Sequence, residues 1–399
     1  MSIYEEFGVR SIINVSGTST RVGGAIMPDA VMDAMVRASK ESVSMTELQA
    51  AASRAIVKVT GAEAGYVTAG ASAGLTQGTA AILAGLDPGK MERLPDTTGM
   101  KNEFIIAREH RNGYDHAVRL AGAKLIEVGM NEMVAGAGVR RTEAWEFEAA
   151  ITENTAGITY TATADSQPPL EQVIAIAKKH NLPVLVDGAG QVPPTANLKR
   201  FIEMGADLVA FSGGKAIRGP QSSGILCGKR DLIMSVALQH LDMDEFFHIW
   251  EPPEDFIDKD RIVGIPRHGI GRGFKVAKEE VIGLLMGLRM FVDGSYEPDY
   301  AERRKHIEYI VDGVSGLPVE PTVIAPKEGA PSLHLKLDTA AIGKSAFDVS
   351  LELKRGNPAV FVQEEGLPDD KLIILSLNLN QERTEALTQR LREVLKKKG

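Results

Sequence analysis

Lys215 and Asp187 are the residues whose types and surroundings point most clearly to chemistry. Lys215 follows the apolar residues 208–211 within a turn of small residues, and Asp187 directly follows the apolar residues 184–186. A lysine amine can form an imine with the aldehyde of pyridoxal phosphate. A carboxylate can keep the ring nitrogen protonated, so that the ring accepts electrons from a substrate carbanion. The pair predicts a pyridoxal phosphate site, which neither residue would indicate alone.

A solvated loop lysine is the ordinary alternative for Lys215. Against it, Gly213 and Gly214 precede the lysine, and residues 219–224 read Gly-Pro-Gln-Ser-Ser-Gly. A loop with so few large side chains brings its backbone close to a neighbouring group. We therefore favour the imine role for Lys215.

A run of small residues separates the strand-like residues 66–68 from the helix-like residues 75–86. It consists of Gly70, Ala71, Ser72, Ala73 and Gly74. Free amides and the dipole at a helix start favour an anion, and small residues let the backbone close around a phosphate. The run matches neither a Walker loop nor a dinucleotide fingerprint. A tight turn is the alternative, but Asp187 and Lys215 downstream favour binding of the cofactor phosphate.

Three further polar residues could contact this cofactor. His110 follows the apolar residues 104–107 and could stack on the ring, although a histidine that caps the next helix is the alternative. Gln191 could donate to the phenolic oxygen, and Ser212 could bind the phosphate. We expect Lys215, Asp187 and His110 to be the catalytic residues.

Two segments carry polar residues that could bind a substrate. The loop 14–21 is rich in Ser and Thr, and the stretch 267–275 alternates cations with glycine. Such cations suit a phosphate or carboxylate, including one shared across a subunit boundary. The candidates are Ser16, Thr18, Thr20, Arg21, Arg267 and Arg272. An ordinary Gly/Ser/Thr turn and a solvated basic loop are the respective alternatives.

The composition is that of a globular protein with a large core. Hydrophobic residues make up 44% and charged residues 25% of 399 residues, enough for two domains. The net charge of −8 disfavours an extended nucleic-acid surface. Cys227 is the only cysteine, which excludes an intrachain disulfide and a multi-cysteine zinc site, and we expect no metal.

No segment has the features of a secretory signal or a membrane span. Acidic residues occur within the first seven positions, and Arg289 interrupts the longest apolar stretch, residues 281–292. We expect a cytoplasmic protein that acts on a small molecule, without a membrane or nucleic-acid partner.

Helix-period segments and short apolar strands alternate through the middle of the chain. The expected strands are residues 104–107, 124–128, 157–161, 184–186 and 208–211, and the expected helices include 75–86 and 170–180. Continuous Val/Ile/Leu strands separated by helices predict an α/β fold with a mostly parallel sheet covered on both faces.

The chain ends are expected to form a smaller α+β domain. Residues 28–60 are expected to be helical, 251–272 irregular and 276–292 helical. Further expected elements are strands at 332–337, 359–362 and 371–375, and helices at 345–354 and 383–397. We therefore expect an N-terminal segment, 1–47, that packs with a small C-terminal domain, 286–399, and a large cofactor domain, 48–285.

The lysine loop resembles that of a known enzyme group. Residues 211–224 read Phe-Ser-Gly-Gly-Lys-Ala-Ile-Arg-Gly-Pro-Gln-Ser-Ser-Gly. This string is similar to the loop of fold-type I pyridoxal phosphate enzymes in the bacterial selenocysteine synthase-like group, especially the D-glucosaminate-6-phosphate ammonia lyase type. Residues 13–17 and 275–280 are also similar to this group, and the resemblance covers roughly residues 5–290.

The resemblance implies roles and a fold. Lys215 would carry the cofactor, Asp187 would pair with the ring nitrogen and His110 would stack, while residues 70–74 and Ser212 would hold the phosphate. The fold would be the fold-type I pyridoxal phosphate-dependent transferase type. Sites of this type are usually shared between subunits, so a homodimer or a larger homo-oligomer is expected.

Two features depart from the selenocysteine synthases. Those enzymes carry an extra N-terminal domain for transfer RNA, whereas this core is expected to begin almost at Met1. They also have an arginine in a late Asp-Leu-Arg motif, where residues 375–379 here read Leu-Ser-Leu-Asn-Leu. We therefore expect a different mode of substrate recognition and no transfer-RNA chemistry.

The leading hypothesis is a lyase that removes water and ammonia from a small polar β-hydroxy amino acid to give a 2-oxo acid. A phosphorylated amino-sugar acid is one candidate substrate. The released Lys215 would remove the Cα proton. A racemase, aldolase or β-replacement enzyme would use the same residues. A selenium transferase acting on seryl-transfer RNA and a non-catalytic cofactor-binding protein are more distant alternatives. The substrate, its configuration and the fate of the carbanion stay open.

Overall fold

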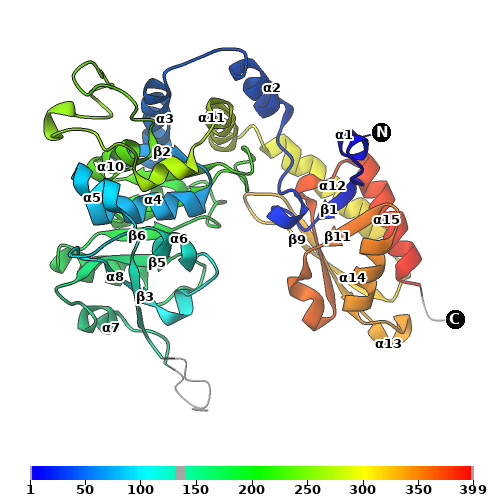
Figure 1. The fold of residues 1–399 in the computed structure, drawn as a ribbon. Helices are drawn as coiled ribbons and strands as arrows, with labels where there is room; N and C mark the ends of the chain where they lie inside the picture. The colour runs from blue at the N-terminus through cyan, green and yellow to red at the C-terminus, as the bar shows by residue number, and fades with distance from the viewer. Residues whose placement is uncertain (1, 131–139, 397–399) are drawn as a thin grey trace. The chain divides into compact units, whose positions relative to one another are not determined.

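The structure is a computed structural model that describes residues 2–130 and 140–396. The chain forms two compact units (Figure 1). Unit 1 contains Met1–Ile26 and Met290–Gly399, and unit 2 contains Met27–Arg289. Each unit has its own hydrophobic core. The division falls at residues 26 and 289, rather than at 47 and 285 as expected from the sequence.

Unit 2 is built on a seven-stranded sheet in the order β2-β8-β7-β6-β5-β3-β4. Its strands are β2 (Ala64–Thr68), β3 (Glu103–Ala107), β4 (Lys124–Val128), β5 (Thr155–Thr161), β6 (Val184–Asp187), β7 (Leu208–Ser212) and β8 (Gly224–Gly228). β8 runs antiparallel to β2 and β7, and the other pairs are parallel. The expectation of a mostly parallel sheet is confirmed, although β8 was not predicted.

Helices cover both faces of this sheet. α4 (Ala71–Ala84) lies on one face, where Gly78 lets it approach Leu185, Leu208 and Leu226. α6 (Asp115–Leu120) and α10 (Arg230–His240) pack beside α4. α3 (Met45–Thr60), α8 (Leu170–Lys179) and α9 (Asn197–Met204) pack on the strands from the opposite face. The shorter helices are α5 (Pro88–Arg93) and α7 (Ala144–Ala149).

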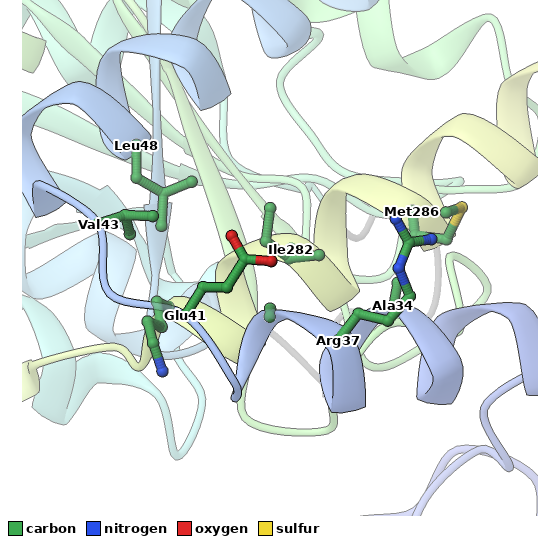
Figure 2. Close-up of a pocket in the computed structure, with 9 residues that line it drawn as sticks. Ala34, Arg37, Glu41, Val43, Leu48, Ile282 and Met286 are labelled. Atoms are coloured by element: carbon green, nitrogen blue, oxygen red, sulfur yellow. The ribbon is translucent and has the colours of Figure 1, made fainter.

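Residues 28–60 form two helices rather than the continuous helical segment expected from the sequence. α2 (Asp29–Ala38) ends before α3 begins at Met45, because Ser44 caps α3 by accepting a hydrogen bond from the Glu47 amide. α2 packs against α11 (Lys278–Val292), where Gly283 leaves room for Met35. This packing places α2 in unit 2. Figure 2 shows the largely apolar pocket between these helices, lined by Ala34, Arg37, Ala38, Glu41, Val43, Leu48, Lys278, Ile282 and Met286.

Unit 1 combines two small sheets with helices. β1 (Ile12–Val15) pairs in parallel with β11 (Ala359–Val362), and β12 (Lys371–Leu375), β10 (Ser332–Leu337) and β9 (Val319–Ile324) form an antiparallel sheet. Its helices are α1 (Ile3–Glu6), α12 (Glu297–Gly313), α13 (Thr339–Ile342), α14 (Ala346–Arg355) and α15 (Gln381–Val394). Lys397, the expected end of the last helix, lies outside the described residues. Within residues 2–130 and 140–396, every helix is too short or too polar to cross a bilayer.

A buried polar chain fixes a loop to the core of unit 2. Nδ1 of His240 lies 2.7 Å from the Tyr66 hydroxyl, and Nε2 lies 3.0 Å from the carbonyl oxygen of Phe274. Because a carbonyl can only accept, Nε2 carries the proton and Nδ1 accepts from Tyr66. Burial lowers the pKa of His240 from 6.5 to about 4. The neutral ring therefore anchors the 3-10 helix Ile270–Phe274 to β2.

The stability of unit 2 is expected to fall as the pH decreases from 6.5 toward 4. The unfolded chain takes up a proton that the folded state excludes, so stability present above pH 6.5 is lost as the pH falls. The lowering of the His240 pKa from 6.5 to about 4 corresponds to about 3 kcal/mol of unfolding free energy. Urea unfolding at several pH values would measure this slope. His240→Gln should flatten it, and an unchanged slope in that variant would contradict the assignment.

Candidate active site

The predicted cofactor residues of unit 2 lie at one edge of its sheet, the edge formed by the carboxyl ends of its parallel strands. β2 leads into Gly70, β3 into His110, β6 ends at Asp187, and β7 ends at Ser212 just before Lys215. Since these strands are parallel, their carboxyl ends share this edge. In open α/β sheets this edge is where ligands bind. The fold therefore gathers residues that are distant in sequence.

Lys215 and Asp187 are brought together at this edge. Nζ of Lys215 lies 3.9 Å from the position that a Cβ would take on Gly190, in the loop that follows Asp187. The Asp187 carboxylate accepts a hydrogen bond from the Ala189 amide at 3.0 Å. Burial raises the pKa of Asp187, while the Ala189 amide and the Lys215 charge oppose this rise in part. A carboxylate in this setting would be stabilised by a protonated ring nitrogen.

The glycines around Lys215 pack closely against the rest of the lysine loop and against α11. A side chain on Gly214 would lie 2.6 Å from the Cα of Gln221, and one on Gly213 would lie 2.5 Å from Cδ1 of Leu284. A side chain on Gly219 would lie 3.1 Å from the Cα of Leu284, which belongs to α11. The close approach predicted from the composition is thus an approach to the rest of the loop and to α11. This packing fixes the backbone that carries Lys215.

Residues 70–74 form the start of α4. Gly70 precedes the helix with a φ of 93°, a left-handed conformation that favours glycine. Gly224 of β8 lies against Gly70, because a Cβ added to Gly224 would be only 2.4 Å from the carbonyl carbon of Gly70. Ala71, Ser72 and Ala73 supply the first helical amides, which have no acceptor within a helix. The binding of the cofactor phosphate by this N-terminus stays a prediction.

Gln191 and Ser212 lie near this edge, and both side chains are half-buried. The Gln191 amide donates to the Gly188 carbonyl at 2.9 Å, and its own carbonyl accepts from Asn197 at 2.6 Å. Ser212 is the register partner of Gly224. Their contacts with the cofactor stay predictions.

The N-terminal loop belongs to unit 1, and its predicted role in substrate binding stays a prediction. Ser16 is buried and its hydroxyl lies 3.3 Å from Oε1 of Gln363, while Thr18 and Thr20 share the same loop. Arg21 forms an ion pair of 2.9 Å with Glu364.

Asn14 and Asn378 give this loop its shape. The Asn14 side chain donates to the carbonyls of Gly17, Val22 and Gly24. Asn378 donates to the carbonyls of Gly17 and Gly24, and its oxygen accepts from the Ile26 amide at 2.9 Å. Sequence reasoning noted the segment 375–379 but did not find this bracing role.

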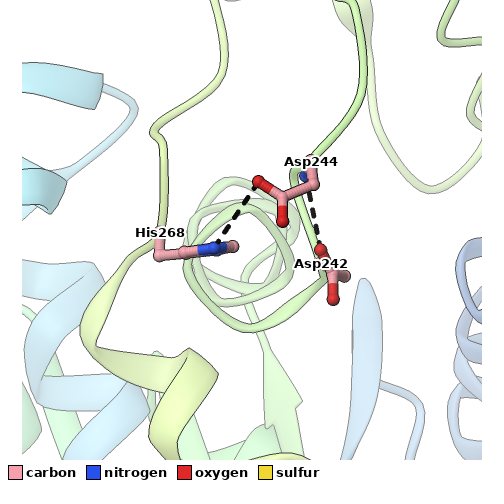
Figure 3. A group of neighbouring side chains, drawn as sticks. All are labelled: Asp242, Asp244 and His268. Atoms are coloured by element: carbon pink, nitrogen blue, oxygen red, sulfur yellow. Dashed lines mark hydrogen bonds and ion pairs between the residues drawn. The ribbon is translucent and has the colours of Figure 1, made fainter.

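Arg267 and Arg272 lie in unit 2. The Arg267 backbone amide donates to Glu92, and the Arg272 side chain forms an ion pair of 2.8 Å with Asp242. Figure 3 shows Asp242 beside Asp244 and His268, all exposed at the surface. Since Asp242 already pairs with Arg272, binding of a substrate anion by Arg272 would require this pair to open. The predicted role of both arginines stays a prediction.

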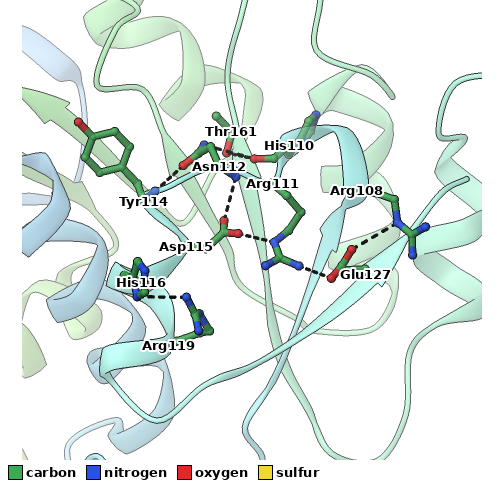
Figure 4. Close-up of polar contacts among 10 residues, drawn as sticks. All are labelled: Arg108, His110, Arg111, Asn112, Tyr114, Asp115, His116, Arg119, Glu127 and Thr161. Carbon is green, nitrogen blue, oxygen red and sulfur yellow. Dashed lines mark hydrogen bonds and ion pairs between the residues drawn. The ribbon is translucent and has the colours of Figure 1, made fainter. Parts of the chain in front are cut away.

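His110 is buried and its ring packs edge-on against Tyr160, with ring centroids 4.5 Å apart. Figure 4 shows the turn that carries it. Among the described residues, neither ring nitrogen has a hydrogen-bond partner. Burial lowers the pKa of His110, while the Glu109 charge and, to a smaller extent, the Gln167 backbone oppose this shift. The ring is therefore neutral near pH 7, and its stacking on a cofactor stays a prediction.

These residues fit pyridoxal phosphate. They provide a lysine amine, a buried carboxylate beside it, a helix N-terminus for a phosphate and a buried imidazole with unpaired nitrogens. Buried polar atoms are normally hydrogen-bonded, so the unpaired His110 nitrogens suggest a partner beyond the described residues, a position that a cofactor could fill.

The chain is similar in sequence to several known proteins. Residues 114–243 match the L-seryl-tRNA selenium transferase family, SelA. The chain is 28% identical over 405 residues to a 5'-C-glycyluridine monooxygenase-decarboxylase of a Streptomyces species, covering 98% of this chain and 92% of that protein. It is 25% identical over 401 residues to the D-glucosaminate-6-phosphate ammonia lyase of Salmonella typhimurium, covering 98% of each.

The fold is also found in solved structures. A D-glucosaminate-6-phosphate ammonia lyase structure matches 99% of this chain and 98% of its own with a TM-score of 0.81 at 24% identity. A cysteine desulfurase from Thermococcus onnurineus NA1 matches 96% of this chain and 94% of its own with a TM-score of 0.53 at 16% identity. The chain is therefore a pyridoxal phosphate enzyme with the fold-type I fold, and it resembles the selenocysteine synthase-like group.

Proposed function

We propose that this enzyme is a lyase that eliminates water from a small polar β-hydroxy amino acid, after which hydrolysis of the enamine product takes up one water and releases ammonia to give a 2-oxo acid. The observation that carries the proposal is the Lys215 amine beside the buried Asp187 carboxyl, at the sheet edge where α4 begins. The full-length similarity to the ammonia lyase of Salmonella typhimurium supports elimination as the reaction. It also supports a phosphorylated amino-sugar acid as the substrate class.

Each residue would have a distinct task. Bound pyridoxal phosphate supplies an electron sink for the carbanion at the substrate Cα. Lys215 would hold the cofactor and, once released by the substrate amine, take the Cα proton and return a proton to the departing β-hydroxyl. Asp187 would keep the ring nitrogen protonated. The amides at the start of α4 would hold the phosphate, and the neutral His110 would lie against the ring.

We also propose that the enzyme works in the cytoplasm as a homo-oligomer. A single buried cysteine suits a reducing compartment. Met32 and Val36, one helical turn apart on α2, are both exposed, and Val43, beside the same helix, lines the pocket of Figure 2. An exposed apolar surface of this kind is suited to a second copy of the chain.

A second candidate activity is oxidative decarboxylation of an amino acid. It is favoured by the 28% identity to the monooxygenase-decarboxylase over nearly the whole chain. The two reactions leave different traces, because oxidative decarboxylation consumes oxygen and releases carbon dioxide, whereas elimination does neither.

The proposed function predicts release of ammonia together with a 2-oxo acid. The holoenzyme would be incubated with D- and L-β-hydroxy amino acids and with phosphorylated amino-sugar acids, with and without oxygen. We expect equal amounts of ammonia and 2-oxo acid from at least one substrate, independent of oxygen. Racemisation without ammonia, or products that require oxygen, would overturn the proposal.

Lys215→Ala is expected to abolish both covalent cofactor attachment and turnover, because position 215 supplies the attaching amine and the proton carrier. Visible absorbance of the purified protein and mass spectrometry after borohydride reduction would measure attachment. Lys199→Ala, which removes an exposed lysine of α9, is the matched control and should retain both properties. Attachment or turnover that survives in Lys215→Ala would refute the assignment.

Asp187→Asn is expected to stabilise the cofactor-free protein at neutral pH while lowering activity on the order of 100-fold or more. Asparagine keeps an acceptor for the Ala189 amide but removes a buried charge. Because the folded-state pKa is raised above 3.8, the wild-type carboxylate weakens the fold above that pH, and the stability difference should shrink as the pH falls toward 3.8. Thermal unfolding of the wild-type and Asp187→Asn apoproteins at several pH values would measure this difference in stability. A less stable apo variant at neutral pH would contradict the electrostatic argument.

A further inference from the structure

Two kinds of contact hold His110: its ring packs against Tyr160, and its backbone carbonyl is hydrogen-bonded. Both ring nitrogens lack a hydrogen-bond partner among the described residues, so they do not orient the ring. The carbonyl oxygen of His110, in contrast, accepts two hydrogen bonds (Figure 4). Oγ1 of Thr161 donates at 3.2 Å, and Nδ2 of Asn112 donates at 3.3 Å.

Thr161 is also the strand neighbour of Asp187. It is the last residue of β5, and its Cα is the register partner of the Asp187 Cα on β6. Paired residues on neighbouring strands point to the same face of a sheet. The Thr161 side chain therefore lies on the face that bears the Asp187 carboxyl, while its hydroxyl binds the backbone of His110. Thr161 thus binds the backbone of one predicted catalytic residue and is the strand neighbour of another.

The other contacts of this turn act on neighbours of His110. Glu109 pairs with Arg141, and Arg111 pairs with Asp115 and Glu127. These ion pairs hold the turn along its outer side, and most of their side chains are partly exposed. Asn112 is only two residues from His110 and moves with the same turn. Among these contacts, Thr161 is the donor that ties the His110 backbone to the central sheet.

We propose that Thr161 is a positioning residue that fixes His110 relative to Asp187, and with it the distance between the imidazole and the bound cofactor ring. This inference rests on the proposed cofactor contact of His110. The role requires a hydroxyl donor of the right length. Serine should preserve it, and valine, which has the same shape without the donor, should not.

Cofactor titration provides a readout that does not depend on turnover. The affinity for pyridoxal 5'-phosphate and the absorbance maximum of the bound form would be measured for Thr161→Val, Thr161→Ser and wild type. We expect Thr161→Val to weaken binding on the order of 5- to 10-fold and to shift the absorbance maximum, as for loss of one hydrogen bond. Thr161→Ser should stay within about 2-fold of wild type.

Thr159→Val is the matched control, since Thr159 is a buried threonine on the same face of β5. It should bind the cofactor like wild type. Thr161→Val with unchanged affinity and absorbance, or Thr161→Ser as damaging as Thr161→Val, would overturn the assignment while leaving the proposed function intact. A wild-type protein without bound cofactor would refute both.

A double-mutant cycle tests whether Thr161 acts through His110. In a His110→Ala background, Thr161→Val should lower cofactor affinity by less than about 2-fold, because the residue that Thr161 positions is gone. The same 5- to 10-fold loss in both backgrounds would show independent action and would refute the positioning role.

Discussion

The arrangement of unit 2 depends on a buried carboxylate held beside a lysine. Burial raises the pKa of Asp187, and the amide of Ala189 and the charge of Lys215 compensate only in part. A buried charge that lacks full compensation is costly, so such a carboxylate persists where a ligand completes its environment. The surrounding elements maintain this pairing: β6 ends at Asp187, and the loop of Lys215 is packed on α11 through Gly219.

The same edge of the sheet offers opposite charges to the two ends of one ligand. The N-terminus of α4 carries a partial positive charge suited to a phosphate, and Asp187 offers a negative charge suited to a protonated ring nitrogen. Lys215 emerges from β7, which lies between β8 and β6 in the sheet. With the predicted contacts, a cofactor that is anionic at one end and cationic at the other would be oriented before any substrate arrives. The neutral state of His110 adds no charge that would disturb this polarity.

Elements with strong local patterns were predictable from the sequence, and those that depend on tertiary packing were not. The strands β3, β6 and β7 contain short apolar runs, and Asp187 follows one of them directly while Lys215 lies four residues after another. β8 was missed because its five residues are bounded by Gly224 and Gly228 and read as an extension of the lysine loop. α12 was missed because it is polar overall and even buries Arg303 and His306. The contact of His110 with Tyr160 joins the 3-10 turn Arg108–His110 to β5, which is distant in sequence, so no local pattern could indicate it.

In the segment 375–379, Asn378 makes contacts that an arginine could not make. Asn378 donates to two carbonyls and accepts from the Ile26 amide, whereas an arginine has no acceptor and could not make the last contact. The shape of the N-terminal loop is thus determined within unit 1. On that loop Arg21 shares Glu364 with Lys354, so two cations meet one anion and one positive charge remains in excess. The predicted contact of Arg21 with a substrate anion would therefore leave Glu364 paired with Lys354.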